Sequence, residues 1–417
     1  MQLAPDAVPP DVPKNDPHGG VGFTEFVLMV SAMMAMNALG TDAMLPALGQ
    51  IGRSLGVVEE ARWQWIVTAF LLGFGGAQIL YGPISDRYGR RPILLWGIVF
   101  YALGNLAAAL APSFSLLLAA RVAQGVAVAS TRIVVVSVVR DCYAGRQMAR
   151  VMSLAFMILL AVPILAPSLG QLIMLVAPWQ AIFACLAAYA LLVALWLARR
   201  LPETLHPEYR RPINVRSIMA AVRQTVTARQ AIGYTLAQTL MMSAVFAYIN
   251  SLPPIFDDVF KAPALFPLVF ALTGMALAVS ALLNSRIVVR VGTRRMSHTA
   301  LLGFIFFAAV HTGIARHGEG LVLFTVMQAL TMFCFGLAAS NFGAMAMEPV
   351  GAIAGTAASV QGFISTVVGA IVGFVISQHF DGTTLPLVGG FLACGLGALV
   401  IVLITERFQL FHPRMGK

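Results

Sequence analysis

The sequence predicts an all-α membrane protein in which twelve transmembrane helices form two pseudo-symmetric six-helix bundles. Of the 417 residues, 59% are hydrophobic and only 11% are charged, whereas about 25% of the residues in a soluble domain are charged. Apolar runs of about 20 residues, the length that crosses about 30 Å of hydrocarbon, recur along the chain. Most charges lie in short loops between these runs, so the net charge of +10 does not indicate a nucleic-acid-binding face.

The apolar runs divide the chain into spans, loops and tails. In chain order, we expect spans at residues 23–46, 63–83, 93–112, 114–138, 150–174, 179–199, 230–251, 263–283, 297–315, 320–346, 353–377 and 384–405. The predicted domains are an N-terminal tail (1–22), an N-terminal six-helix bundle (23–199), a basic linker (200–229), a C-terminal six-helix bundle (230–405) and a C-terminal tail (406–417). Residues 1–20 lack a basic stretch followed by a cleavage site, so we expect a cytoplasmic tail and not a signal peptide.

Basic residues are distributed unevenly between the two sides of the membrane. If the N-terminus lies inside, the inner segments carry 21 of the 27 Lys and Arg residues and the outer loops carry four. Lys and Arg in short loops favour the cytoplasmic side, so both termini and the linker are predicted to be cytoplasmic. The last two basic residues, Arg121 and Arg132, lie within spans.

A short repeat relates the two halves. Arg87-Tyr-Gly89-Arg90-Arg91 follows the second span of the first half, and Arg290-Val-Gly292-Thr-Arg294-Arg295 follows the second span of the second half, 203 residues later. Two parallel six-helix repeats are a plan that secondary transporters use.

The first copy of this repeat belongs to the stretch Gly82-Pro-Ile-Ser-Asp86-Arg87-Tyr-Gly89-Arg90-Arg91. We expect Gly82 and Pro83 to end a helix and Gly89 to allow a tight turn. The arginines can hold the loop in the cytoplasm and meet anionic lipid headgroups. Asp86 can meet a helix N-terminus or an arginine, and Arg140, at the inner end of span four, is the candidate partner.

Asp42 is the one acidic residue that the sequence places well inside a span, and Arg121 lies at a similar depth in span four. A charge near the bilayer centre costs several kcal/mol, so it indicates function. Burial favours the neutral acid and a nearby guanidinium favours the carboxylate. This competition predicts that Asp42 exchanges protons with Arg121 as its partner. The alternatives are that Asp42 caps the outer end of span one and that Arg121 extends its side chain to the interface.

Several motifs together resemble those of the Bcr/CflA-type drug:proton antiporters of the major facilitator superfamily. The stretch from Gly82 to Arg91 resembles the superfamily's signature loop, and Thr41-Asp42-Ala-Met-Leu-Pro46 resembles the span-one motif of the branch. Leu118-Ala-Ala-Arg121-Val-Ala-Gln124-Gly125 resembles its span-four motif, and Ala161-Val-Pro163-Ile-Leu-Ala-Pro167-Ser-Leu-Gly170-Gln171 its span-five motif. Ala166 and Gln171 depart from the common span-five pattern, which has glycine there.

The resemblance implies the major facilitator fold, in which spans one, four, seven and ten line a central cavity. It also implies that the acid of the signature loop is a cytoplasmic latch that stabilises the outward-open state. We expect gating to involve Gly82, Asp86, Arg87, Gly89, Arg90, Arg140, Pro163 and Pro167. The substrate-binding candidates on the cavity spans are Asn37, Gln124, Tyr234, Gln238, Phe246, Gln328 and Asn341. The alternative for each of the latter is a contact with lipid or with a neighbouring helix.

The predicted function is secondary active export of small, largely apolar drugs or metabolites in exchange for protons, by alternating access in a bacterial inner membrane. The sequence has no phosphate-cradling motif, no H-E-x-x-H motif and no histidine or cysteine cluster, so we expect neither an enzyme nor a cofactor. The expected partners are a small-molecule substrate, protons and membrane lipid, with the protein a monomer. Alternatives are a dedicated exporter of a sugar or amino-acid derivative and a sodium-coupled transporter.

Overall fold

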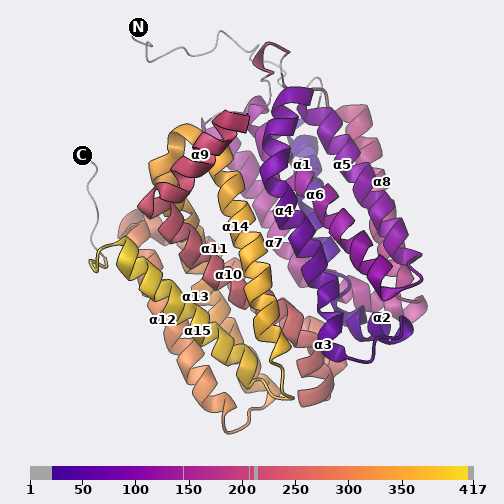
Figure 1. Cartoon of the computed structure of the whole chain (residues 1–417), viewed down its shortest axis with the longest axis vertical. Coiled ribbons are helices and arrows are strands. Elements are labelled where there is room, and N and C mark those ends of the chain that lie inside the picture. The colour runs from indigo at the N-terminus through magenta and orange to yellow at the C-terminus, as the bar shows by residue number, and fades with distance from the viewer. Residues whose placement is uncertain (1–20, 144, 206, 211–214, 412–417) are drawn as a thin grey trace.

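The computed structural model describes residues 21–143, 145–205, 207–210 and 215–411, and every regular element in these ranges is a helix (Figure 1). The long helices are α1 (Phe23–Asp42), α4 (Trp65–Tyr88), α5 (Arg90–Ala109), α6 (Phe114–Cys142), α7 (Gly145–Val176), α8 (Gln180–Arg200), α10 (Arg229–Pro254), α11 (Phe266–Val291), α12 (Thr293–Ala315), α13 (Leu321–Met347), α14 (Ala354–Gln378) and α15 (Leu385–Thr405). The short elements are η1 (Leu45–Ala47), α2 (Leu48–Ser54), α3 (Glu60–Trp63), η2 (Pro207–Tyr209), α9 (Val215–Thr227), η3 (Ile255–Val259), η4 (Pro263–Leu265) and η5 (Glu348–Ile353).

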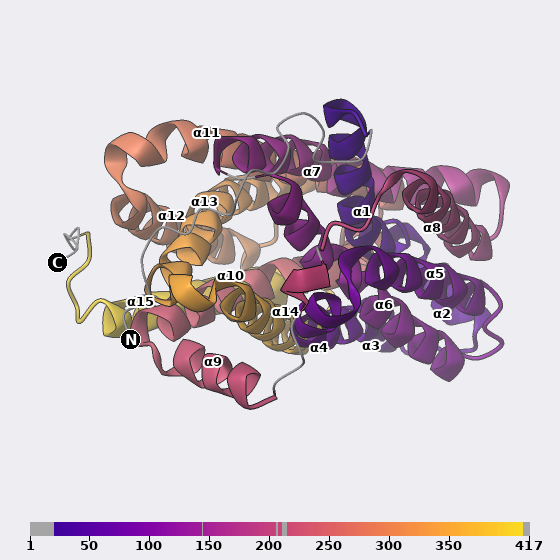
Figure 2. The same ribbon diagram turned by 90° about the horizontal axis from the view of Figure 1, so that it is seen from above.

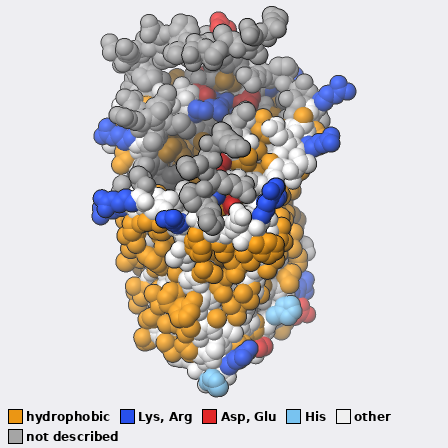
Figure 3. Space-filling model, turned by 90° about the vertical axis from the view of Figure 1, so that its left-hand side faces the viewer, with side chains coloured by type: hydrophobic (Ala, Val, Ile, Leu, Met, Phe, Trp, Pro, Cys, Tyr) orange, Lys and Arg blue, Asp and Glu red, His pale blue; other side chains and the backbone are white. Residues whose placement is uncertain are grey.

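Each of the twelve predicted spans coincides with one long helix, so the predicted all-α fold is confirmed. Over the described residues, eleven helical segments are long and apolar enough to cross a membrane, and α7 adds the shorter apolar stretch Leu165–Val176. Figure 3 shows a broad belt of hydrophobic side chains with Lys and Arg along its upper border. The exposed apolar side chains of such a belt need hydrocarbon and not water as their surroundings.

The first span is shorter than the sequence predicts. Helix α1 ends at Asp42, and the chain then turns into η1 and α2. Pro46, the second residue of η1, cannot donate a backbone hydrogen bond and disfavours a helical conformation of the residue before it. The last turn of α1, with Gly40, Thr41 and Asp42 buried, therefore ends inside the protein.

The second span is longer than expected, and the prediction that Gly82 and Pro83 end it is wrong. Helix α4 continues through Pro83 to Tyr88 and stops at Gly89, which has a φ of 103°. Helix α5 begins at the next residue, Arg90, so a single glycine joins the two helices. Gly292, with a φ of 86°, joins α11 to α12 in the same way. Glycine adopts this left-handed conformation without the steric cost that other residues meet.

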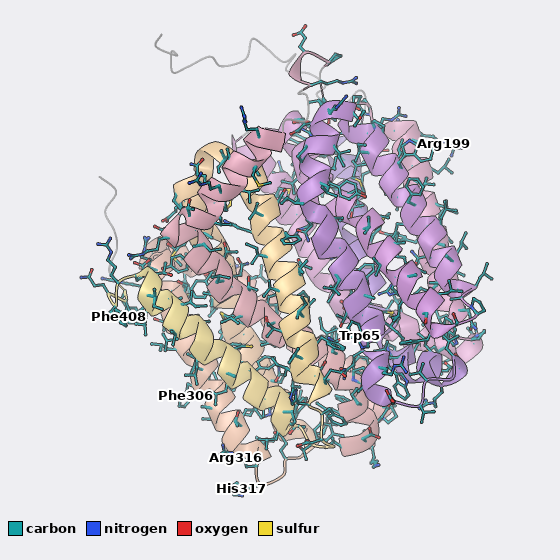
Figure 4. The ribbon with its side chains drawn as sticks, viewed as in Figure 1. Trp65, Arg199, Phe306, Arg316, His317 and Phe408 are labelled. Carbon is teal, nitrogen blue, oxygen red and sulfur yellow. The ribbon has the colours of Figure 1, made fainter. Side chains whose placement is uncertain are left out.

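The long helices fall into two groups that lie side by side, α1 to α8 and α10 to α15 (Figures 1 and 2). The groups meet where α4 packs on α14 and where α7 packs on α11. The amphipathic helix α9 lies between the groups in sequence and packs across α10 and α14 at one end of the molecule. We call this the α9 end, and we call the other the far end, where the loop with Arg316 and His317 lies (Figure 4).

Candidate functional site

Arg121, on α6, is completely buried and is held by three neutral oxygen atoms. Its Nε donates to the carbonyl oxygen of Ile66 on α4 at 3.0 Å, and its Nη2 donates to that of Gly40 on α1 at 2.8 Å. Its Nη1 donates to Oε1 of Gln124 at 2.5 Å. The guanidinium also lies 4.4 Å from the ring centroid of Phe70, an arrangement that stabilises a desolvated cation.

Close approach of α4 and α6 allows Arg121 to reach the α4 backbone. A Cβ at Gly73 would overlap the carbonyl oxygen of Val122, and a Cβ at Gly125 would overlap that of Phe70. Only glycine fits at such contacts, because the backbones of the two helices touch there. These two glycines therefore set the depth at which the arginine is buried.

Gln124 was predicted to bind substrate, but the oxygen and the nitrogen of its side-chain amide both form hydrogen bonds within the first group of helices. Its Oε1 accepts from Arg121, and its Nε2 donates to the carbonyl oxygen of Gly104 on α5 at 2.9 Å. The side chain is completely buried. Gln124 thus orients Arg121 and ties α5 to α6.

Asp42 is the last residue of α1 and is only 5% exposed. Its carboxylate forms no hydrogen bond or ion pair with any residue that the structure describes, and it is not within 4.0 Å of the Arg121 guanidinium. The direct pairing expected from the sequence is therefore absent from this conformation. The physical reason is the end of α1, since its last carbonyl groups have no partner within the helix and one of them, Gly40, accepts from Arg121 instead.

Helix α7 covers the break that follows Asp42. A Cβ at Gly170 would overlap the carbonyl oxygen of Ala43, so a glycine is required where α7 crosses the chain. Pro167, one turn earlier, is buried, and Pro163 lies within the helix, with its side chain outside the described part of the chain. The span-five motif therefore packs against the residue that follows Asp42.

Unpaired buried polar atoms occur on several of the helices that were expected to line the cavity. Among the described residues, Oδ1 of Asn37 on α1 and Nε2 of Gln328 on α13 are buried without a hydrogen-bond partner. Both side-chain polar atoms of Asn250 on α10 are buried and unpaired as well. A buried polar atom without a partner costs free energy, which indicates water or ligand nearby in some state.

The other substrate candidates lie at contacts between helices. Gln238 of α10 faces Gly343 of α13, and Phe246 packs on Gly369 and Gly373 of α14. These positions bring both residues to the surfaces along which α10 meets its neighbours.

Tyr234 and Asn341 have structural partners away from Arg121. The Tyr234 hydroxyl donates to Oε1 of Glu406 at 2.6 Å, within a polar cluster at the α9 end that includes Arg294. Nδ2 of Asn341 donates to Oδ1 of Asn284 on α11 at 2.8 Å. Both were expected to face substrate, but their polar groups are occupied by these contacts.

The predicted gating residues at the α4–α5 joint form an ion-pair cluster centred on Arg90. Arg90 pairs with Asp86 at 2.6 Å and with Asp141, at the end of α6, at 3.1 Å. The predicted partner, Arg140, lies 3.9 Å from Asp141 instead. Continuation of α4 to Tyr88 explains the difference, because it brings Asp86 and Arg90 close together across Gly89. Arg87 is exposed and lies over the ring of Tyr88.

Glu203, a residue that sequence reasoning missed, completes this cluster. Its carboxylate accepts from the backbone N–H groups of Arg90 at 2.9 Å and Arg91 at 3.3 Å. A Cβ at Gly89 would overlap its Oε2. The repeat could have revealed it, since Glu406, which pairs with Arg294, lies at the same 203-residue offset from Glu203.

The seam between α4 and α14 is polar at the far end, a second feature that the sequence did not single out. Ser377 Oγ donates to Oε1 of Gln64 at 2.6 Å, and Gln378 Nε2 donates to the same oxygen at 2.8 Å. Further along, Gln78 Nε2 donates to Thr366 at 3.2 Å. The antiparallel register continues to Gly82, where an added Cβ would lie 3.8 Å from Oγ of Ser359.

Comparison with known proteins gives matches over most of the chain. A family model described as Major Facilitator Superfamily matches residues 30–374. The bicyclomycin resistance protein homolog of Haemophilus influenzae is 27% identical over 391 residues, covering 92% of this chain and 96% of that protein. The multidrug resistance protein MdtL of Klebsiella pneumoniae is 28% identical over 395 residues, covering 92% of this chain and 96% of that protein. The partially occluded, inward-open xylose transporter XylE from E. coli aligns with a TM-score of 0.71 and 12% identity, covering 95% of this chain and 99% of that one.

Proposed function

The chain belongs to the Major Facilitator Superfamily, and we propose that it is a secondary active exporter of small, largely apolar drugs or metabolites in exchange for protons. Transporters of this family handle small-molecule substrates across membranes. Export of drugs is supported by two relatives that match more than nine-tenths of this chain and whose names refer to bicyclomycin and multidrug resistance.

The observation that carries the proposed proton coupling is the isolation of Asp42. Asp42 is 5% exposed, its carboxyl group has no described partner, and the residue lies two positions beyond the carbonyl group that accepts from Arg121. A buried carboxylate is costly unless it is paired or hydrated, so its protonation depends on its surroundings. When the helices move, Asp42 becomes hydrated or meets a substrate, and this change couples proton exchange to transport.

Arg121 positions this end of α1 in the proposed mechanism. Its three hydrogen bonds join α6 to α1 and α4 and fix the side chain of Gln124, so the guanidinium holds the carbonyl group two residues before Asp42. Substrate binds in the space between the two groups of helices, near the unpaired amides of Asn37 and Gln328. Met and aromatic side chains on these helices suit variable, apolar ligands.

Gating is assigned to the cluster at the α4–α5 joint. Asp86 is half-exposed and pairs with Arg90, and the register of α4 on α14 brings Asp86 level with the first turn of α14 at Ala354. A carboxylate beside a helix N-terminus is stabilised by the helix dipole. Contact between Asp86 and this turn when the α9 end closes, and its loss when that end opens, supplies the latch. The Lys and Arg at the belt's upper border support a cytoplasmic position for the α9 end.

The decisive experiment measures efflux from cells of a cationic dye and of chloramphenicol, with the wild type compared with Asp42→Asn. The variant is expected to express normally and to lose proton-driven efflux, because an amide does not titrate. Asp381→Asn, which changes an exposed acid in a surface turn, is the matched control and should retain efflux. Equal efflux by the wild type and Asp42→Asn would remove Asp42 from the coupling mechanism.

A second measurement distinguishes coupling to protons from coupling to sodium ions. Detergent-solubilised wild-type protein should release protons on addition of a transported drug, and Asp42→Asn should release none. Efflux from proteoliposomes driven by a sodium gradient, with no pH gradient, would contradict proton coupling.

A further inference from the structure

A groove lies on the outer surface of the first group of helices, between α5 and α8. It has a volume of about 660 Å³, and apolar side chains form most of its wall, among them Leu95, Trp96, Val99, Leu191 and Leu195. Trp96 is 60% exposed and Leu191 is 48% exposed, so the groove opens away from the protein core. Helices α5 and α8 lie on the side remote from the second group (Figure 2). The groove therefore opens toward the hydrocarbon of the membrane.

One end of this groove is cationic. Arg91 lines it there, and its Nη2 donates to the carbonyl oxygen of Ala198 at 2.6 Å. Its Nε is buried without a hydrogen-bond partner, and its guanidinium forms no ion pair with any residue in the described ranges. The accessible Nη groups of this unpaired guanidinium therefore have donor capacity left for an anionic oxygen, the acceptor with which arginine forms its strongest hydrogen bonds.

Glu203 also lines this end but does not neutralise the arginine side chain. Its two oxygens accept from the backbone N–H groups of Arg90, Arg91 and Leu205 at 2.9, 3.3 and 3.0 Å. The carboxylate is therefore occupied by the backbone, and the Arg91 guanidinium keeps its charge available to a ligand.

The dimensions of the groove fit one leaflet of a bilayer. Arg91 and Val99 are eight residues apart on one helix, which corresponds to about 12 Å at about 1.5 Å per residue. One leaflet contributes about 15 Å of the hydrocarbon core, which is about 30 Å thick. Arg91 lies at the end of α5 next to the α4–α5 joint, and Trp96 follows a little more than one turn deeper, near the depth at which tryptophan is enriched in membrane proteins.

We propose that the α5–α8 groove is a binding site for a membrane phospholipid. The phosphodiester oxygens accept from the Arg91 guanidinium, and one acyl chain lies along Leu95, Trp96 and Val99 on α5 and Leu191 and Leu195 on α8. A soluble anion would satisfy Arg91 alone and leave the apolar wall uncovered, whereas a phospholipid satisfies both. This site is separate from Asp42 and Arg121 and does not depend on the identity of the transported substrate.

Native mass spectrometry of the delipidated, full-length protein tests the site. Palmitoyl-oleoyl phosphatidylglycerol is titrated in, and the apparent dissociation constant of the first bound lipid is measured. We expect Arg91→Ala to weaken this binding at least tenfold and Arg91→Lys to retain much of it. Arg199→Ala, which removes an exposed arginine near the same end of α8 but outside the groove, is the matched control and should change binding less than twofold (Figure 4).

Blocking the apolar part gives an independent readout that keeps Arg91. Ala194 lines the groove, so Ala194→Phe should fill it and also weaken binding at least tenfold. The thermal unfolding temperature of each variant shows whether the protein remains folded. Palmitoyl-oleoyl glycerol, which lacks the phosphate, and inorganic phosphate, which lacks the chains, should each fail to compete.

The proposal is overturned if Arg91→Ala and Ala194→Phe both bind phosphatidylglycerol as the wild type does. It is also overturned if Arg199→Ala loses as much binding as Arg91→Ala, because the effect would then be one of general charge. If the phosphate-free glyceride competed as well as phosphatidylglycerol, Arg91 would have no part in the binding. If inorganic phosphate competed as well, the acyl chain would have none.

Discussion

Replacement of Gln64 by leucine is expected to favour the conformation that is open at the far end. Gln64 is 3% exposed and lies where α3 meets α4, directly against α14. Its Oε1 accepts from Ser377 at 2.6 Å and from Gln378 at 2.8 Å, and its Nε2 makes a long contact of 3.4 Å with the Ser377 carbonyl oxygen. These bonds join the two groups of helices, so they must break when the groups separate there.

The change in the conformational equilibrium depends on which hydrogen bonds Ser377 and Gln378 keep in the variant. Without Gln64, Ser377 Oγ still donates to Phe374 and Gln378 Nε2 still donates to Ala61, so neither is left unpaired. The loss is then the net value of two short hydrogen bonds, about 0.6 kcal/mol each between membrane helices, or about 1.2 kcal/mol. Because about 1.4 kcal/mol is a tenfold change in an equilibrium constant, the ratio of open to closed molecules should rise about sevenfold.

Double electron–electron resonance gives this ratio directly. Spin labels at Arg62→Cys and Asp381→Cys lie on exposed positions on opposite sides of the seam, in a background without the exposed Cys185. The ratio of the longer-distance to the shorter-distance population should increase about sevenfold in Gln64→Leu. Gln180→Leu, which removes a glutamine away from the α4–α14 seam, is the control. An unchanged distribution in Gln64→Leu, or an equal change in the control, would refute the role of this seam as a gate.

Three further predictions follow from the same contacts. Asp86→Asn removes the ion pair with Arg90 and should slow turnover while the substrate affinity stays within about twofold; transport kinetics in proteoliposomes check this, and loss of affinity alone would contradict the latch. Gly170→Val should lower the thermal unfolding temperature, because its Cβ would overlap the Ala43 carbonyl, whereas Gly313→Val, with open space around it, should not. Arg121→Met removes the donor of two buried acceptors, the Gly40 carbonyl oxygen and Gln124 Oε1, and should lower the free energy of unfolding by at least about 2 kcal/mol. Stability equal to that of the wild type would mean that those acceptors are satisfied in another way.

The helices could be predicted from the sequence because a bilayer demands a fixed length of apolar chain. The burial of Asp42 and Arg121 followed from the same rule, since both lie within such runs. Their mutual geometry did not follow, because depth says nothing about the direction in which a side chain turns. Arg121 turns toward the nearest strong acceptor, and the unsatisfied carbonyl groups at the end of α1 provide one.

The substrate candidates show a second limit. Tyr234 and Asn341 lie on spans without a distinct polar face, so no hydrophobic periodicity identifies the side of the helix that faces a cavity. Their hydroxyl and amide groups are used by Glu406 and Asn284, residues that are distant in sequence. Pro83 shows a third limit, because packing of α4 on α14 maintains a helix across a proline that would end it in isolation.

The single glycine between α4 and α5 has a mechanical consequence. A joint of one residue cannot extend. Any tilt of α4 against α14 therefore also moves the first turn of α5, which contains Arg90 and Arg91. Rearrangement along the midline of the protein is thereby transmitted to its periphery, where α5 borders the surrounding bilayer.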